Sequence, residues 1–431
     1  MRDVDDLLGF LGAAPSPYHA VAEAARRLVL AGFVELNLTE RWPGEPGQYF
    51  VQRDGALVAW SVAAWSRSDA ATPFTIVGAH TDSPNLRIKP RPDTGGHGWR
   101  QLAVEVYGGA LWNSWLDRDL GLSGRVMVEG CPEPLLLRID EPLMRIPQLA
   151  IHLDRDVNGQ GLKLNPQCHL SPVWGLGAGV DGDFVSYLAQ ALTEQGDDPI
   201  GADEIVSWDL MLHDLTPPAL IGRDQELIAS ARLDNLLSCW AAVAALCLEV
   251  ERSRHRDDAA MTGGPNDVAP VAMACLYDHE EVGSASATGA AGSFLAQVIE
   301  RSVLARDGTR EDLLRALAGS MCVSADGAHA THPSYPERHE PGHHVVPNGG
   351  PVIKVNANQR YASDARTAAT LVEACASAGV DHQWFVSRND QPCGSTIGPA
   401  TAAQLGVATV DVGLAMLSMH SARELCGAED P

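Results

Sequence analysis

A histidine and an aspartate stand two positions apart, His80 and Asp82, directly after a short apolar run that ends at Ala79. The run is β-branched in its middle, which predicts a buried strand over residues 73–79. Open α/β sheets bind ligands where strands leave the sheet, so both side chains are well placed for chemistry. An imidazole can bind a metal through one ring nitrogen while a nearby carboxylate fixes its orientation. For this pair alone, a solvated histidine at a strand end is the alternative.

Adjacent carboxylates form a second candidate group. Glu280 and Glu281 follow a predicted buried strand over residues 271–277. Two like charges so close together repel unless one binds a cation or takes a proton. One glutamate could therefore bind a metal while the other, Glu280, acts as general base toward metal-bound water. A solvated acidic turn is the alternative for this pair.

Asp234, Asp326 and His420 complete the set of candidate ligands. Asp234 lies at the predicted start of a long helix, where the helix dipole also stabilises a carboxylate without any metal. Asp326 directly follows a predicted strand over residues 321–324, and His420 lies between the last predicted strand and a predicted short helix. One sheet edge could gather these groups with His80 and Glu281. Two histidines and three carboxylates, one of them bridging, suit two zinc ions that share an activated water, although Co²⁺ or Mn²⁺ would suit the same ligands.

The elements that must position these groups alternate between strands and helices. Further strands are predicted over residues 49–52, 57–62, 351–355, 383–386 and 408–412. Helices are predicted over residues 3–12, 17–31, 233–252, 288–304 and 363–379, and another is predicted to start after Thr309. This alternation predicts an α/β fold in which helices sandwich a mixed, mostly parallel sheet.

The pattern changes between about residue 90 and residue 216. Glycine and proline are frequent there, and the predicted strands are short, over residues 102–107, 124–128 and 135–139. These features predict an inserted β-rich domain, and two consecutive prolines at 217–218 indicate where the chain returns. We therefore expect a discontinuous main domain of residues 1–90 and 219–431, with an insert of residues 91–218.

Composition narrows the class of protein. A chain of 431 residues is too long for one ordinary core, and 45% hydrophobic with 20% charged residues is typical of a soluble globular protein. The formal charge of −24 argues against nucleic acid and anionic membrane as partners. We find no apolar run of bilayer-spanning length. The acidic N-terminus does not resemble a signal peptide, and nine cysteines without a C-x-x-C pair fit a reducing compartment, so we expect a cytoplasmic protein.

Seven blocks along the chain carry a specific resemblance. In order, they are AHTDSPNLRIKP (79–90), RLDNL (232–236), DHEEVGS (278–284), SADGAHATHPSY (324–335), GPVIKVNANQRYASD (350–364), RNDQPCGSTIGP (388–399) and MHSARE (419–424). Together they resemble the aspartyl aminopeptidase family of dinuclear zinc exopeptidases. The blocks keep the family order and cover nearly the whole chain, so the resemblance implies a zinc exopeptidase-like fold and removal of an N-terminal Asp or Glu from peptides.

The resemblance also implies a role for each candidate residue. One metal ion would be held by His80, Asp234 and Asp326, and the other by Asp234, Glu281 and His420. Glu280 would be the general base, and Asp82 would orient His80. In the family, the insert makes dimer contacts and the subunits assemble into a dodecamer.

Three further residues have implied roles near the substrate. By similarity, His152 would reach the active site of a neighbouring subunit, and His329 and Lys354 would contact the substrate. From the sequence alone, a plain loop residue is the alternative for His329, although it lies three residues from the proposed ligand Asp326. Lys354 lies in an apolar strand, where a cation is rare unless paired, but a lysine facing water at a sheet edge is the alternative.

Two other classes of function remain open on the sequence, one within enzymes and one outside them. The same ligands could serve a general aminopeptidase or an amide deacylase. Outside enzymes, the chain could be a non-catalytic cargo or scaffold protein on a peptidase fold. That last hypothesis predicts that a ligand or the base is missing, whereas the sequence contains all six residues.

Overall fold

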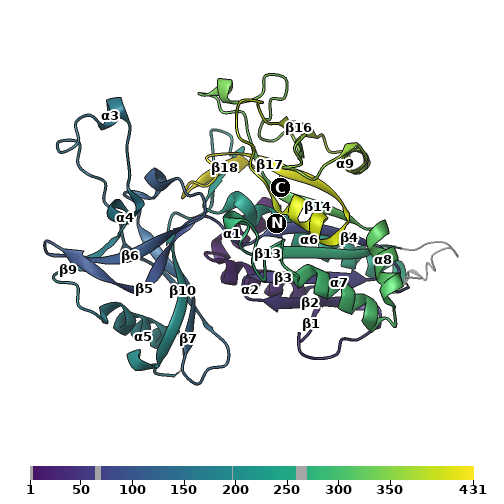
Figure 1. Cartoon of the computed structure of the whole chain (residues 1–431), viewed down its shortest axis with the longest axis horizontal. Coiled ribbons are helices and arrows are strands. Elements are labelled where there is room, and N and C mark those ends of the chain that lie inside the picture. Colours follow the sequence, from purple (N-terminus) through teal and green to yellow (C-terminus); the bar gives the residue numbers. More distant parts are fainter. Residues whose placement is uncertain (1–2, 64–68, 197, 259–268) are drawn as a thin grey trace.

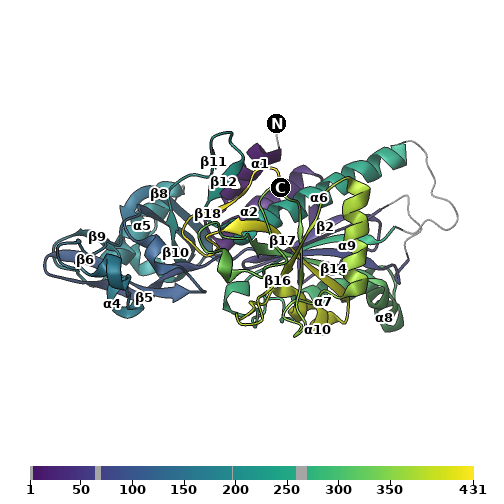
Figure 2. The same cartoon turned by 90° about the horizontal axis from the view of Figure 1, so that it is seen from above.

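Two β-sheets lie side by side in the computed structural model, which describes residues 3–63, 69–196, 198–258 and 269–431 (Figures 1 and 2). The main sheet has 12 strands, in the order β1-β2-β3-β13-β4-β14-β17-β18-β12-β11, with β15 and β16 joined to it beside β17. Its strands are β1 (Val34–Glu35), β2 (Gly47–Arg53), β3 (Ala56–Val62), β4 (Phe74–His80), β11 (Ala219–Ile221), β12 (Leu227–Ser230), β13 (Val271–Tyr277), β14 (Met321–His329), β15 (Val352–Val355), β16 (Gln383–Val386), β17 (Ala408–Leu417) and β18 (Glu424–Gly427).

Strand direction in the main sheet is mixed. The central strands β13, β4, β14 and β17 run parallel to one another, as do the pairs β1–β2 and β15–β16. The strands that flank this centre, including β3, β15 and β18, pair with it in the antiparallel sense. Parallel neighbours end at the same edge of a sheet, so the carboxyl ends of β13, β4 and β14 meet there.

Helices cover both faces of the main sheet, which confirms the predicted fold class. One core forms between the sheet and the helices α1 (Asp3–Ala13), α2 (Pro17–Leu30) and α6 (Leu233–Asp258). A second core forms on the other face with α7 (Phe294–Ala305), α8 (Arg310–Gly319) and α10 (Ile397–Leu405). The remaining long helix of this part, α9 (Ala365–Ala378), packs on β17. The two buried faces explain why the central strands are mostly apolar.

Several helices begin where the sequence predicts. The Ser16 hydroxyl accepts a hydrogen bond from the His19 amide at the start of α2, and Pro17 occupies the first turn. Thr309 and Asp312 form a reciprocal capping box at the start of α8. The helix predicted over residues 288–304 begins only at Phe294, because Gly289 and Gly292 make close turns on the backbones of Ser284 and Ser286.

The second sheet is antiparallel throughout, in the order β8-β7-β10-β5-β6-β9. Its strands are β5 (Asn85–Gly96), β6 (Trp99–Tyr107), β7 (Leu120–Val128), β8 (Leu135–Met144), β9 (Val173–Leu176) and β10 (Ile205–Asp214), and α5 (Asp183–Gln195) packs on it. Two short helices, α3 (Val157–Gln160) and α4 (Pro166–His169), lie in the connection from β8 to β9.

Sequence patterning missed half of these strands and α5. The strand β5 contains prolines at positions 90 and 92, which usually exclude a strand. In the structure they lie where the pairing of β5 with β6 shifts register, between Ile88 and Asp93, so no ladder hydrogen bond is lost there. This sheet begins at Asn85, six residues before the predicted start of the insert, and its last strand ends at Asp214.

The long helix α6 corrects one expectation from the sequence. Over Leu233–Arg254 it is long and apolar enough to cross a membrane by length and composition alone. It lies in the main core instead, between the sheet and α1, and 67% of its most apolar window is buried inside the molecule. Its apolar character is therefore explained by packing against the protein.

Candidate metal centre

His80 is the last residue of β4, and its ring is almost fully buried, with a side-chain exposure of 1%. The Nδ1 atom lies 2.9 Å from the backbone carbonyl oxygen of Asp82, which can only accept a hydrogen bond, so Nδ1 carries the proton. The Nε2 atom faces two carboxylates, 3.4 Å from Asp326 Oδ1 and 3.5 Å from Asp234 Oδ1. The ring is thus held on one side and presents a free nitrogen to a cluster of acids, as metal-binding histidines do.

His420 is arranged in the same way on a different element. It lies in the turn after β17 with a φ of 68°, and its Nδ1 donates to the Gly109 carbonyl at 3.2 Å. Its Nε2 atom is 3.2 Å from Glu281 Oε2 and 3.5 Å from Asp234 Oδ2. The prediction of a short helix after His420 is wrong. Glu424–Gly427 form the strand β18 instead, which pairs antiparallel with β12 and β17.

Asp234 lies between the two histidines, and each of its carboxylate oxygens faces one of them. The backbone of Asp234 is not helical although α6 formally begins at Leu233, and the carboxylate points to the histidines instead of capping the helix. Asp234 Oδ1 and Glu281 Oε1 are buried and have no hydrogen-bond partner among the described residues. A buried acceptor without a donor is costly unless something else satisfies it, so a bound cation fits this donor set.

Asp326 lies inside β14 and not after it, because this strand continues five residues beyond its predicted end and reaches His329. Its Oδ1 atom accepts a hydrogen bond from the Gly327 amide at 2.7 Å and lies near His80. Its Oδ2 atom is 3.5 Å from Lys354 Nζ, which also donates to the Gly327 carbonyl at 3.0 Å. Lys354 is only 2% exposed, which excludes the alternative of a lysine facing water at a sheet edge.

Glu280 and Glu281 form a single turn after β13, with side-chain exposures of 15% and 3%. This burial contradicts a solvated acidic turn. Their backbone amides donate to the two oxygens of Asp82, each at 3.0 Å, and the Tyr107 hydroxyl donates to the same carboxylate at 2.7 Å. Asp82 therefore holds both glutamates as well as lying 3.4 Å from the His80 ring.

The electrostatics follow from this crowding of charges. Burial raises the pKa of Glu280 to about 7, and burial with the Asp234 charge holds the pKa of Glu281 well above its usual range. Burial opposes ionisation of His80, but the close carboxylates of Asp234, Asp326 and Asp82 outweigh it and hold the His80 pKa well above its usual value. Protons thus stabilise the cluster in the absence of metal, and a cation would compete with them for the same atoms.

A cavity of about 200 Å³ opens on these groups. Its lining includes Asp234, Glu280, Glu281, Asp326 and His420, together with Lys354, His329, Tyr361, Phe385 and Met419. The structure thus brings together the predicted ligands, the predicted base and two predicted substrate contacts. His152 is not part of this lining, because it lies in the exposed connection between β8 and α3, which projects from the second sheet (Figure 1).

Sequence reasoning missed two residues that hold this cluster, Tyr107 and Glu424. Tyr107 ends β6 of the second sheet and reaches Asp82 across to the main sheet. Glu424 is buried and accepts hydrogen bonds from the amides of Asp234 and His420, at 3.0 and 2.7 Å. Burial raises the pKa of Glu424 to about 8. Glu424 is the last residue of the block MHSARE, four residues after His420, and this position was the available signal.

Comparison with known proteins identifies the family. The family model described as aminopeptidase I zinc metalloprotease (M18) matches residues 10–431. A relative from Streptomyces coelicolor, named as a probable M18 family aminopeptidase 2, is 54% identical over 428 residues, which are 99% of this chain and 94% of the relative. A relative of the same name from Mycobacterium tuberculosis is 51% identical over 431 residues, which are 98% of this chain and 94% of that protein.

Solved structures agree with this match. The cryo-EM structure of an Ape4 and Nbr1 complex contains a chain that is 38% identical, with a TM-score of 0.91 over 99% of this chain and 82% of that one. A structure of the S. cerevisiae mApe1 dodecamer is 28% identical, with a TM-score of 0.81 over 100% of this chain and 93% of its own. These matches confirm the predicted family, and the chain belongs to the M18 family of zinc aminopeptidases.

Proposed function

We propose that this chain is an aspartyl aminopeptidase that binds two zinc ions and removes N-terminal Asp or Glu from peptides. The observation that carries the proposal is the placement of Asp234. One of its oxygens faces His80 and the other faces His420, and each histidine faces one further carboxylate, Asp326 or Glu281. Such a doubled set, with one shared carboxylate, is the donor arrangement that dinuclear zinc hydrolases need.

Charge balance supports two divalent ions over one. Four carboxylates, Asp234, Glu280, Glu281 and Asp326, face the cavity and would carry four negative charges if ionised. One zinc ion together with the Lys354 ammonium would supply three positive charges and leave one negative charge buried without compensation, and a second zinc ion removes that deficit.

Glu280 is proposed as the general base. When bound, zinc ions acidify a coordinated water and polarise the scissile carbonyl. Glu280 Oε2 lies 3.9 Å from His80 Nε2, so this carboxylate faces the space between the ligands. It is not one of the three proposed ligands of either zinc ion. A carboxylate at this place can take a proton from a metal-bound water and then pass it to the nitrogen of the leaving amine.

The preference for acidic residues is proposed to depend on Lys354. Its ammonium group lines the cavity and is 5.2 Å from the centre of the Tyr361 ring. A buried cation beside the metal ligands can pair with the side-chain carboxylate of a substrate. His329, at the end of β14, lines the same cavity and is the proposed second substrate contact.

We further propose that the subunits assemble into a homo-dodecamer and that His152 acts in a neighbouring subunit. Support comes from the related mApe1 dodecamer and from the exposed connection around His152. Leu149, Ile151 and Leu153 are exposed there by 57%, 46% and 75%. Large apolar side chains in a run are typical of a protein interface. A cytoplasmic location is proposed as well, because all nine cysteines are free.

The test is hydrolysis of aspartyl, glutamyl, alanyl and leucyl peptides that differ only in the first residue. We expect the acidic peptides to be cleaved with the highest kcat/KM, activity to vanish on chelation, and zinc to restore it. A preference for leucyl peptides would indicate a general aminopeptidase, and cleavage only of N-acyl substrates would indicate an amide deacylase. No hydrolysis by zinc-loaded protein would favour a scaffold. A monomer in light scattering would remove the dodecamer and the role of His152.

A further inference from the structure

Glu424 begins β18 and is 2% exposed. Its two carboxylate oxygens accept hydrogen bonds from two different chain segments. Oε2 accepts from the Asp234 amide at 3.0 Å, and Oε1 accepts from the His420 amide at 2.7 Å. A single side chain thus spans the shared ligand and one terminal ligand of the proposed metal centre.

The two segments need such a contact because neither is held at this point by regular secondary structure. Asp234 has non-helical backbone angles at the start of α6, and His420 has a φ of 68° in the turn after β17. Their amides would otherwise be buried donors without an acceptor from a helix or sheet ladder. Glu424 satisfies both donors at once.

The position of Glu424 is itself well defined. Its backbone pairs with Ser230 in β12, and β18 also pairs with the end of β17 through Met416 and Cys426. These are the strands from which the Asp234 and His420 segments emerge. A carboxylate anchored on both strands can therefore set the separation of the two segments that leave them.

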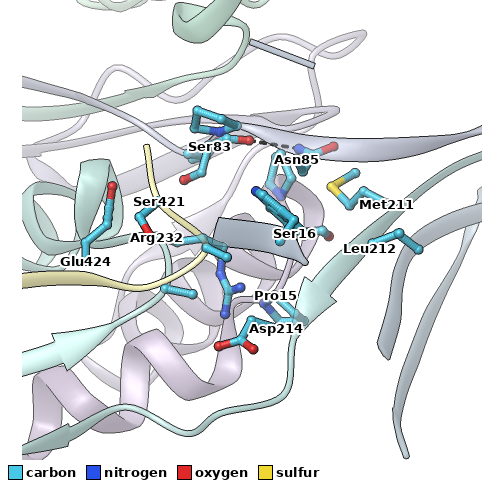
Figure 3. Close-up of a pocket in the computed structure, with 16 residues that line it drawn as sticks. Pro15, Ser16, Ser83, Asn85, Met211, Leu212, Asp214, Arg232, Ser421 and Glu424 are labelled. Carbon is cyan, nitrogen blue, oxygen red and sulfur yellow. Dashed lines mark hydrogen bonds between the residues drawn. The ribbon is translucent and has the colours of Figure 1, made fainter. Parts of the chain in front are cut away.

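The surroundings of Glu424 show that a carboxylate is needed for its hydrogen bonds and not for an ion pair. It lines a small pocket between the two sheets, beside Ser421 and Arg232 (Figure 3). Among the described residues, no Lys, Arg or His nitrogen lies within ion-pair distance of its oxygens. A glutamine would offer one acceptor oxygen and turn an NH₂ group toward the other amide, so it could satisfy only one of the two donors.

We propose that Glu424 is a positioning residue that holds Asp234 and His420 at the separation required to bind the second zinc ion. The proposal rests on the proposed dinuclear function. The ligands of the first zinc ion keep their own supports, since Asp82 holds the His80 ring and the Ser83 hydroxyl donates to the Asp234 carbonyl at 2.7 Å. Loss of Glu424 therefore weakens mainly the position of His420, and with it the binding of the second zinc ion.

The experiment compares wild type, Glu424→Gln and Glu424→Asp as purified full-length proteins. Zinc is removed, and rebinding is followed by competition with a chromophoric chelator, with kcat measured at each free zinc concentration. Glu429→Gln is the matched control, because Glu429 is exposed only five residues away. Melting of the metal-free proteins reports on folding.

We expect Glu424→Gln to bind the first zinc ion as wild type does and the second about 10–100-fold more weakly, the usual cost of losing a group that orients a ligand. Added zinc should then restore kcat, which a purely structural defect would not allow. Glu424→Asp keeps both acceptor oxygens but is one methylene shorter, so we expect a smaller loss of the same ion. It also serves as the test if Glu424→Gln does not fold.

Two results would overturn the proposal. One is wild-type affinity for both ions in the two variants, and the other is an equal loss of both ions. Failure of the proposed function looks different, because wild-type protein itself would then bind fewer than two zinc ions.

Discussion

The two halves of the proposed metal centre are built from different parts of the fold. His80 and Asp326 lie on the adjacent parallel strands β4 and β14, and the His80 side chain is 1% exposed. His420 and Glu281 lie in turns, and the His420 side chain is 30% exposed. The first half is positioned by the sheet ladder itself, whereas the second depends on side chains and loops that hold turns in place.

The second sheet supports the more exposed half. The chain that leaves β6 gives the Gly109 carbonyl to the His420 ring, and the Leu111 amide donates to the His420 carbonyl at 3.0 Å. Gly108 lies so close to Glu281 that a Cβ there would come within 3.1 Å of the Glu281 Cβ, and its φ of +69° also favours glycine. One half is therefore a property of the main sheet, whereas the other also needs the second sheet packed beside it.

Asp234→Asn should have the largest effect, because it weakens the carboxylate shared by both halves. We expect loss of most of the bound zinc and a fall in kcat/KM of at least about 10³-fold, since Lewis-acid stabilisation supplies several kcal/mol. Metal analysis and peptidase assays measure both effects, with the exposed Asp224→Asn as control. Retention of two ions would show that Asp234 is not shared.

Glu280→Gln should separate chemistry from metal binding in both halves. We expect kcat to fall about 10²–10⁴-fold, the usual contribution of a general base, while the zinc content stays unchanged. Zinc analysis of the same sample that is assayed provides the check, and Glu311→Gln on the exposed start of α8 is the control. Near wild-type turnover would remove Glu280 as the base.

His80→Ala and His420→Ala should differ in how zinc is lost. We expect His80→Ala to weaken zinc more, by roughly tenfold or about 1.4 kcal/mol relative to His420→Ala, because water can replace the more exposed ring. Chelator titrations of the two variants measure this difference. Equal affinities would mean that burial does not distinguish the halves.

Tyr107→Phe should have the smallest effect, since it removes one hydrogen bond to Asp82 and leaves three other contacts to that carboxylate. We expect a loss of stability of about 1 kcal/mol and a modest fall in kcat. Thermal melting and steady-state kinetics test this, with the exposed Tyr335→Phe as control. A fall in kcat as large as that of Glu280→Gln would place Tyr107 in the chemistry.

Much of the site could be predicted because its residue types are chemically specific. His80, Asp234 and Glu281 were found as acids and imidazoles beside predicted strand and helix ends, and all lie together in the structure. Local patterning also predicted the cap at Ser16. It failed for β5, where two prolines concealed a strand, and for the region after His420, where a short segment gains its strand structure only by pairing with β12 and β17.

The family, the alternation of strands and helices, and the side chains that can bind a metal could all be predicted from the amino-acid sequence. These depend on residue type and local periodicity, which are written in the chain. Three features could not be predicted in this way: the oxygens of Asp234 face two different histidines, Lys354 is buried against Asp326, and Glu424 and Tyr107 hold the ligand segments. Those contacts join residues far apart along the chain, so they exist only once both sheets are packed together.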